Sequence, residues 1–212
     1  MARRGAVKIV RAIIVGMNAF VDTLLARHSL GGKHLIEPGP DAAALALMAQ
    51  AAARAPDHAG LRPCRFIAVQ GPARQQLADL FEQAAREAGK DAAAQAIERE
   101  RALRVPVTVA VVARIDAGHP LVPAHEQWCA VGGALANFLN AAHGLGFAGK
   151  MLSGHKVRRR LLQQAFCGPG ETLVGWLSIG TAAKALASKH EGQAGAALLS
   201  VWPGARDVKT SL

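Results

Sequence analysis

The sequence predicts one globular domain in which helices and strands both occur. The chain has 212 residues, enough for a single domain that buries roughly 70% of the surface of its unfolded state. Hydrophobic residues make up 51% of the chain and charged residues 19%, whereas disordered chains are poorer in the first and richer in the second. Segments with helical periodicity alternate with short apolar runs of strand-like composition, so the domain combines the two kinds of element.

The basic charge favours a small anionic ligand over nucleic acid. The formal net charge is +10, and part of it is local, because four cations precede the first acid, Asp22. The other basic residues are scattered and are not interleaved with aromatics that could stack bases. We therefore expect a phosphate-bearing small molecule, with a basic nucleic-acid binder as the minority alternative. The four N-terminal cations are Arg3, Arg4, Lys8 and Arg11.

Cysteine and histidine spacing predicts neither a metal site nor a disulfide. The three cysteines, Cys64, Cys129 and Cys167, are far apart and form no CxxC pair, which is typical of a protein in the reducing cytoplasm. No pair among the eight histidines has the HExxH spacing of a zinc enzyme. We therefore expect a cytoplasmic protein without a metal.

A basic extension precedes the expected domain. Its apolar run is interrupted by Lys8 and Arg11 and is followed by no small-residue cleavage pattern, unlike a signal peptide. The run is also too short to span a bilayer, so we expect no membrane partner. We assign residues 1–16 to this extension, either a functional arm or sequence upstream of a natural start at Met17, and residues 17–212 to the domain.

Two helices are expected in the N-terminal part. Apolar residues recur at helical spacing over Asn18–Arg27, which predicts one buried face. The alanine-rich pattern over Asp41–Ala53 predicts a second helix with Asp41 as its N-cap. The residues expected on the buried face of the first helix are Phe20, Val21, Leu24 and Leu25. The core candidates of the second helix are Leu45, Leu47 and Met48.

The middle of the chain is expected to alternate strands and helices. A short apolar run predicts a strand over Phe66–Gln70, and a helix follows from Pro72 to Gly89. The segment Asp91–Leu103 has a helical pattern and is polar enough to lie on the surface. Val105–Ala113 reads VPVTVAVVA, and its unbroken hydrophobicity predicts a buried central strand.

A long helix with an unusual small-residue surface is expected over Pro123–His143. Glycines within a helix cost stability unless something approaches closely, so we expect another helix against this surface, from this chain or from a second subunit. The apolar side is formed by Trp128, Val131, Leu135, Phe138 and Leu139. The small residues are Ala130, Gly132, Gly133, Ala134 and Ala136.

The C-terminal third is expected to hold three elements. A short strand is predicted over Phe147–Leu152, a basic helix over His155–Phe166 and a last core strand over Thr172–Ile179. The tail after Lys184 has no clear period. No internal repeat is evident in the chain.

The loop from Ala53 to Phe66 is the strongest binding-site candidate that the residues alone provide. Ala55-Pro56 ends the preceding helix, and Asp, Gly and Pro residues then supply turn chemistry. Cationic donors on such a turn-rich connection favour an anionic or heteroaromatic ligand, although a solvated surface loop is the alternative. The donors are Arg54, His58, Arg62 and Arg65.

Other motifs favour chemistry carried by a cofactor. The glycines of 144–149 match the letters GxGxxG, but they follow a long helix rather than a strand, which disfavours a Rossmann fold. No GxSxG is present and Cys64 has no identifiable base, so nucleophilic catalysis lacks support. If the chain is an enzyme, we expect a cofactor to carry the reaction.

Three motifs occur in order along the chain, namely RHS at 27–29, APDH at 55–58 and GFAGKMLSG at 146–154. Together they resemble the FMN-dependent nitroreductase family, and most closely its compact branch of NAD(P)H nitroreductases. The match is collinear from about Met17 to Thr181. The resemblance implies an α+β fold in which helices wrap a central, mainly antiparallel sheet. It also implies an intertwined homodimer with FMN at the subunit interface.

The resemblance also implies a set of cofactor-binding residues. Arg27, His28 and Ser29 would hold the FMN phosphate and ribityl region, and Arg54 and His58 would approach the cofactor. Three positions near the end of GFAGKMLSG match those that present backbone and side chain to the flavin at the site formed with the partner subunit. They are Met151, Leu152 and Ser153. The segment matched to the nicotinamide nucleotide is Ala141, Ala142, His143, Gly144, Leu145 and Gly146.

Three positions depart from the family pattern. Gly31 stands where larger members often carry a basic residue, and Cys64 and Leu152 stand where the close branch favours Trp and Arg. Losing a stacking aromatic and a cation should alter the shape of the accepted substrate and the affinity for flavin.

The resemblance implies a two-step exchange in one pocket. NADH or NADPH would give hydride to the flavin and leave, and a nitroaromatic, a quinone or another small-molecule acceptor would then take the electrons. Two kinds of alternative stay open. One is a relative that reduces enoates, removes halogens or degrades its own flavin. The other is a non-catalytic flavin-binding or sensing module.

Overall fold

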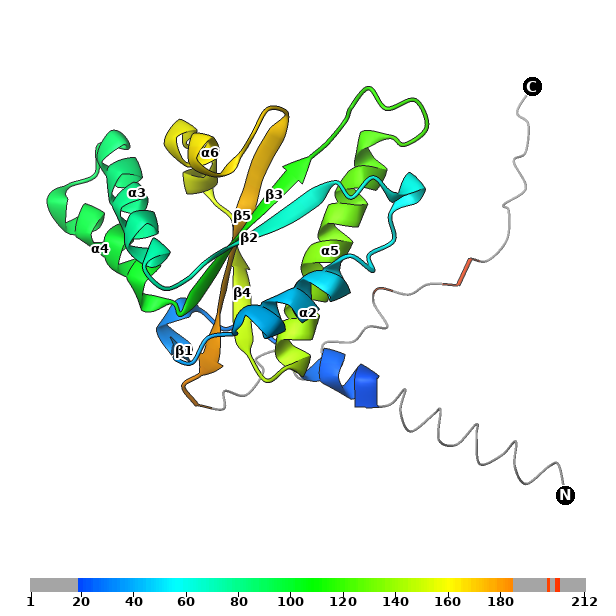
Figure 1. Cartoon of the computed structure of the whole chain (residues 1–212), viewed down its shortest axis with the longest axis horizontal. Helices are drawn as coiled ribbons and strands as arrows, with labels where there is room; N and C mark the ends of the chain where they lie inside the picture. Colours follow the sequence, from blue (N-terminus) through cyan, green and yellow to red (C-terminus); the bar gives the residue numbers. More distant parts are fainter. Residues whose placement is uncertain (1–18, 185–197, 199–200, 203–212) are drawn as a thin grey trace, which may run out of the picture.

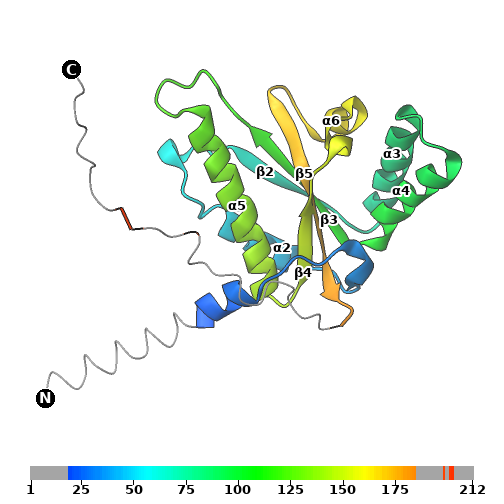
Figure 2. The ribbon, with the colours of Figure 1, turned by 180° about the vertical axis from the view of Figure 1, so that it is seen from behind.

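The computed structural model describes residues 19–184, 198 and 201–202. A central sheet carries helices on both of its faces, with α2 (Ala42–Ala52) and α5 (Ala124–Gly144) on one side (Figure 1). On the other side lie α3 (Ala73–Glu87), α4 (Ala92–Arg104) and α6 (Arg160–Phe166), as the view from behind also shows (Figure 2). The predicted extension and most of the C-terminal tail fall outside the described residues.

The five strands of the sheet pair antiparallel throughout, in the order β1-β5-β3-β2, with β4 also paired to β5. Strand β5 is therefore the centre of the sheet, with β3 along one edge and β4 and β1 in succession along the other. The strands are β1 (Leu35–Ile36), β2 (Cys64–Val69), β3 (Val107–Arg114), β4 (Ala148–Leu152) and β5 (Glu171–Ala182).

Strand β3 confirms the predicted buried central strand. Its residues from Val107 to Ala113 are all buried. Alternate side chains enter two different cores: Ala110 and Val112 face α3 and α6, whereas Val109 faces α2 and α5. A strand covered on both faces needs apolar residues at every position, which explains its unbroken hydrophobicity.

Helices α2 and α5 form the layer on the first face. The predicted cap of α2 is confirmed, because Asp41 Oδ1 accepts a hydrogen bond from Ala44 N at 2.8 Å. Met48 is fully buried, as expected, whereas the prediction for Leu47 was wrong, since this side chain is 51% exposed. The two residues point in different directions around the helix, and only one direction faces the sheet.

The small-residue surface of α5 does receive another helix. Helix α2 packs on α5, and a Cβ added at Gly133 would lie 3.2 Å from Cβ of Ala55, just after α2. Gly132 faces open space instead. Trp128, expected on the apolar side, is 44% exposed, so that prediction was wrong for the single chain.

Helices α3 and α4 form a pair over the second face. Leu77 and Phe81 of α3 are buried, and the Phe81 ring meets Trp176 of β5 edge-on at 5.2 Å between ring centroids. Helix α4 is polar, as expected, but it is not wholly a surface helix, because Glu98 and Ala102 are buried. A buried carboxylate requires cationic partners.

The basic helix predicted over 155–166 is in fact two pieces. The 3-10 turn η3 (His155–Arg158) is followed by α6, and Arg159 between them is extended, at φ −66° and ψ 129°. Val157 and Leu162 are both buried in the same core. Residues five apart lie on different faces of a continuous helix, so burying both requires the break.

The first helix occurs at residues 19–26, and its expected buried face is wrong for the single chain. Phe20 is 64% exposed and Leu25 is 77% exposed. The helix lies beside the C-terminal end of α5 (Figure 2), where Thr23 approaches Gly144. No helix among the described residues is long and apolar enough to cross a membrane.

Candidate functional site

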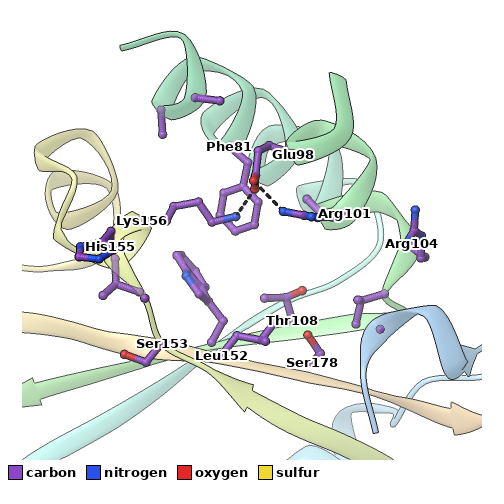
Figure 3. A pocket seen from close by; sticks show the side chains of 18 of the residues that line it. Phe81, Glu98, Arg101, Arg104, Thr108, Leu152, Ser153, His155, Lys156 and Ser178 are labelled. Atoms are coloured by element: carbon purple, nitrogen blue, oxygen red, sulfur yellow. Dashed lines mark hydrogen bonds and ion pairs between the residues drawn. The ribbon is translucent and has the colours of Figure 1, made fainter. Parts of the chain in front are cut away.

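A cavity of about 760 Å³ lies between the sheet and the α3–α4 pair (Figure 3). Its floor consists of Thr108 from β3 and of Trp176 and Ser178 from β5. The walls come from α3, α4, the end of β4, η3 and the 3-10 turn η1 (Gly32–His34). The cavity is therefore lined by segments that lie far apart in the sequence, from residue 32 to residue 178.

Cations dominate the lining of this cavity. Seven lysines and arginines line it, against a single carboxylate, Glu98. Such a surplus of positive charge favours an anionic ligand, and the apolar rings of Phe81 and Trp176 provide surface for a planar group. The seven cations are Lys33, Lys90, Arg101, Arg104, Lys150, Lys156 and Arg159.

Three of these cations form ion pairs with Glu98. It is only 5% exposed, and its carboxylate lies 3.0 Å from Lys90 Nζ, 2.8 Å from Arg101 Nη1 and 2.8 Å from Lys156 Nζ. Burial alone would raise the pKa of Glu98, but hydrogen bonds from Lys156 and Lys90 and the charge of Arg101 lower this pKa to about 2. Glu98 is therefore ionised at neutral pH.

Lys156 is held at the cavity wall by two contacts. Its Nζ bonds to Glu98 and also lies 3.5 Å from the centroid of the Phe81 ring. Burial lowers the pKa of Lys156, and the hydrogen bond from its ammonium group to Glu98 opposes this change. The ammonium group keeps a fixed position within the cavity.

The end of β4 brings three predicted cofactor-binding residues to the same cavity. Met151, Leu152 and Ser153 all line it, and Ser153 Oγ donates a hydrogen bond to the carbonyl oxygen of Val174 at 2.8 Å. Glycine is required next to this strand end. A Cβ at Gly175 would come within 2.8 Å of the carbonyl oxygen of Leu152.

The predicted phosphate-binding segment lies against the other end of β4. Ser29 forms a parallel bridge with Gly149, and Leu30 N donates to the carbonyl oxygen of Gly149 at 3.1 Å. The chain then continues directly into Lys33 at the cavity wall. His28 Nε2 is buried without a hydrogen-bond partner among the described residues, so the segment offers an unused polar atom.

The family model for the Nitroreductase family matches residues 33–181. Its match covers more than half of the chain. The chain belongs to the Nitroreductase family. This is a family of oxidoreductase enzymes, so the cavity belongs to an oxidoreductase.

Two relatives in the Nitroreductase family are similar over most of their length. The Escherichia coli protein YdjA, named as a candidate NAD(P)H nitroreductase, is 33% identical over 162 residues, which cover 76% of this chain and 87% of YdjA. A Haemophilus influenzae protein with the same kind of name is 34% identical over 152 residues, covering 70% of this chain and 82% of that protein.

Solved structures share the nitroreductase fold. A nitroreductase-like family protein from Bacillus cereus has a TM-score of 0.74 at 20% identity, covering 87% of this chain and 96% of that one. A variant of NfnB from Sphigopyxis, described as an FMN- and NADPH-dependent nitroreductase, has a TM-score of 0.63 at 16% identity, covering 87% and 99%. The α+β fold with an antiparallel sheet is thereby confirmed.

The segment expected to meet the nicotinamide nucleotide, 141–146, lies near the segment predicted to bind phosphate but does not line the cavity. Burial lowers the pKa of His143, and the charges of Arg27 and His28 lower it further, so these three side chains are close together. The glycines of this segment end α5 and lead into β4. The order is helix then strand, as expected, which excludes a Rossmann turn here.

Arg54 and His58 are not brought to the cavity within one chain. His58 Nδ1 lies 2.9 Å from Glu126 Oε2 near the start of α5, and both side chains are exposed. The segment predicted to bind phosphate lies near the end of α5, because the charges of its Arg27 and His28 act on His143. Glu126 and Gly144 are 18 positions apart in α5, which corresponds to about 27 Å along the helix between the contact of His58 and the end of α5.

The sequence alone did not identify the lysines and arginines that line the cavity as candidate site residues. Lys150 stands inside the GFAGKMLSG motif, and Arg101 and Arg104 share one face of α4 at a spacing of three residues. This spacing could have indicated two cations that face a ligand together. However, the same polar pattern is expected for a helix face that is exposed to solvent. Lys156 carried no signal of its own, since it stands in a run of basic residues.

Proposed function

We propose that this chain is an FMN-dependent oxidoreductase that transfers hydride from NADH or NADPH to a nitroaromatic, a quinone or a similar small-molecule acceptor. The observation that carries the proposal is the cation-lined cavity at the end of β4 in a member of the Nitroreductase family. When bound, FMN would supply the redox chemistry, accepting a hydride and then giving it up. The residues of the chain would bind the FMN, orient it and stabilise its negative charge.

The residues present fit FMN at both of its ends. The phosphate would be held by Arg27, His28 and Ser29 together with Lys33, and the buried, unpartnered Nε2 of His28 offers an additional polar contact. The ring system would lie near the strand end at 151–153. Trp176 Nε1, which is buried without a partner among the described residues, lines the same space.

The electrostatics of the cavity suit a ligand that becomes more negative on reduction. Arg101 and Lys156 hold positive charge at fixed positions, because both are bonded to the buried Glu98. Preorganised charges stabilise developing negative charge without reorientation. This arrangement supplies an electrostatic role without a general base, which agrees with the absence of a convincing base in the sequence motifs.

We further propose that two copies of the chain form a homodimer that completes the site. Arg54 and His58 would reach the cavity of the other copy, because neither lines the cavity of its own copy and about 27 Å of helix separates the Glu126 partner of His58 from Gly144. Exposed apolar side chains are available for such an interface, among them Phe20, Leu25 and Trp128. In a two-fold dimer, a contact made by one copy is repeated by the other.

The remaining expectations belong to the same proposal. Residues 17–212 would form the single domain, with residues 1–16 as an extension, in a cytoplasmic protein. Its partners would be the small-molecule acceptor and the second copy of the chain, with neither nucleic acid nor membrane.

The test is the visible absorption spectrum of the purified protein before and after NADPH is added without oxygen. We expect a flavin spectrum that bleaches on addition and returns when an acceptor is supplied. Protein that neither copurifies with FMN nor binds it when mixed contradicts the proposal. Bound FMN that neither NADH nor NADPH reduces would identify a flavin-binding module without this activity.

A further inference from the structure

A second hollow, of about 250 Å³, adjoins the main cavity. Its lining consists of Ser153, Gly154, His155, Val157 and Arg158. All of these except Arg158 also line the main cavity. A ligand that occupies the main cavity and extends over Ser153 and His155, both at the cavity edge in Figure 3, therefore reaches this side hollow directly.

The side hollow carries groups that recognise a phosphate. Its lining includes His155 and Arg158, whose imidazole and guanidinium are hydrogen-bond donors, and contains no carboxylate. The hydroxyl of Ser153 already donates to the carbonyl oxygen of Val174. Arginine is well suited to phosphate because its planar fork of donors matches the oxygen geometry. The lining therefore favours a compact anion with several oxygen atoms.

The charge of Arg158 is not neutralised by its neighbours. Within residues 19–184, no ion pair joins Arg158, Arg159 or Arg160 to a carboxylate. By contrast, Arg101 and Arg104 on the opposite wall are both paired with glutamates. Among the described residues, the cations around the two hollows without an ion pair are therefore Arg158 and Arg159, together with Lys33 and Lys150 of the main cavity.

The backbone fixes which of the three arginines faces the hollow. Val157 is buried and anchors η3, and Arg159 N donates to the carbonyl oxygen of Lys156 at 3.0 Å. Arg158 lines the side hollow and Arg159 lines the main cavity, whereas Arg160 lines neither. The chain therefore contains its own matched control, an exposed arginine two residues from Arg158.

We propose that the side hollow binds the 2′-phosphate of NADPH and makes NADPH the preferred hydride donor over NADH. The inference rests on the proposed function, in which a nicotinamide dinucleotide enters the main cavity. The two dinucleotides differ only in this phosphate, so a dedicated anion site beside the cavity discriminates between them. A hydrogen bond to a charged group contributes enough to change affinity about tenfold at a partly exposed site.

The first experiment compares hydride donors on the FMN-loaded protein. Flavin reduction is followed by stopped-flow absorbance without oxygen, and kcat/KM is obtained for NADPH and NADH. We expect wild type to favour NADPH. Arg158→Ala should lower the NADPH:NADH ratio about tenfold with little change for NADH, Arg158→Lys should retain part of the preference, and Arg160→Ala should leave the ratio unchanged.

The second experiment does not depend on turnover. Isothermal titration calorimetry measures binding of 2′,5′-ADP and of 5′-AMP to wild type, Arg158→Ala and Arg160→Ala. We expect wild type and Arg160→Ala to bind 2′,5′-ADP about tenfold more tightly than 5′-AMP, and Arg158→Ala to bind the two alike. Thermal melting of each variant checks that the fold is intact.

Failure of this inference differs from failure of the proposed function. Protein that binds FMN and is reduced equally well by NADH and NADPH, or whose ratio does not change in Arg158→Ala, overturns the inference alone. Equal affinity of wild type for 2′,5′-ADP and 5′-AMP overturns it as well. Protein that does not bind FMN overturns the proposed function, while the calorimetric comparison still tests the anion site.

Discussion

Glu98 and Lys156 stand 58 residues apart in the sequence, and their charged groups lie 2.8 Å apart at the wall of the cavity. Glu98 belongs to α4, and Lys156 belongs to η3 on the far side of the space. The ion pair therefore connects α4 with η3 across the cavity. It fixes the distance between these two elements and the position of the Lys156 ammonium group.

Replacing Glu98 should destabilise the fold strongly. We expect Glu98→Ala to lower the free energy of unfolding by about 3 kcal/mol, because it leaves three cations near a buried site without their partner. Urea unfolding followed by tryptophan fluorescence measures the change. The control is Glu100→Ala, whose exposed pair with Arg104 should contribute less than about 1 kcal/mol. Equal losses in the two variants would contradict the role of Glu98.

The same carboxylate should make stability depend on acid pH. Its pKa is about 2 in the folded state, against 4.5 for an ordinary glutamate, so its contribution is complete above pH 4.5 and is lost as the pH falls towards 2. Linkage gives a contribution of about 3 kcal/mol. Unfolding free energies of wild type and Glu98→Gln, measured from pH 7 to pH 2, should therefore converge over this interval.

Glu171 titrates in the same acid range, since Arg65 and the backbone of Gly168 hold its pKa at about 2. The difference between wild type and Glu98→Gln removes that shared contribution. The charged groups that face Glu98 are those of Lys90, Arg101 and Lys156. If the difference in unfolding free energy between wild type and Glu98→Gln stays constant down to pH 2, these contacts do not lower the pKa of Glu98.

Arg54 and His58 should matter for flavin binding although neither lines the cavity of its own chain. We expect Arg54→Ala and His58→Ala each to weaken FMN binding about tenfold, measured by the quenching of FMN fluorescence on titration. Arg65→Ala is the control, because Arg65 is bonded to Glu171 and to the carbonyl oxygen of Phe166 and has a structural role. A larger effect from Arg65 would show that the site is centred elsewhere.

Flavin retention should also depend on dimerisation. Leu25→Asp changes a side chain that is 77% exposed in the single chain, so it should leave the fold of one copy intact but disfavour an apolar interface. We expect sedimentation to show monomers and FMN binding to fall by at least tenfold. Ile97→Asp, on α4 at the other face of the sheet, should change neither. Monomers that retain FMN normally would disprove a shared site.

Much of the fold could be predicted because its elements carry local signals. The unbroken apolar run of β3, the Asp41 cap of α2 and the glycines that end α3 and α5 each act within a few residues of their own position. The errors occurred where a distant contact decides the outcome. The break at Arg159 follows from burying Val157 and Leu162 in one core, which no local pattern of basic residues indicates.

The candidate site likewise combines residues that a local motif indicates with residues that only the tertiary structure brings together. Met151, Leu152 and Ser153 could be proposed from a short motif, and the structure brings all three to one cavity. The cations opposite them could not, since a lysine or arginine on a polar segment looks the same whether it faces solvent or a ligand. Arg54 and His58 were predicted as partners of the same cofactor, but within one chain neither lines the cavity, and His58 pairs with Glu126 near the start of α5.

The sequence by itself determined which segments become strands and helices, and its ordered motifs indicated the family, because those properties depend on neighbours along the chain. Only the tertiary structure decided that Glu98 and Arg101 on one wall of a cavity meet Lys156 from the other wall, and that Arg158 lines the hollow beside it while Arg160 does not. Charges act through space, and the antiparallel pairing of β4 with β5 brings these distant residues together.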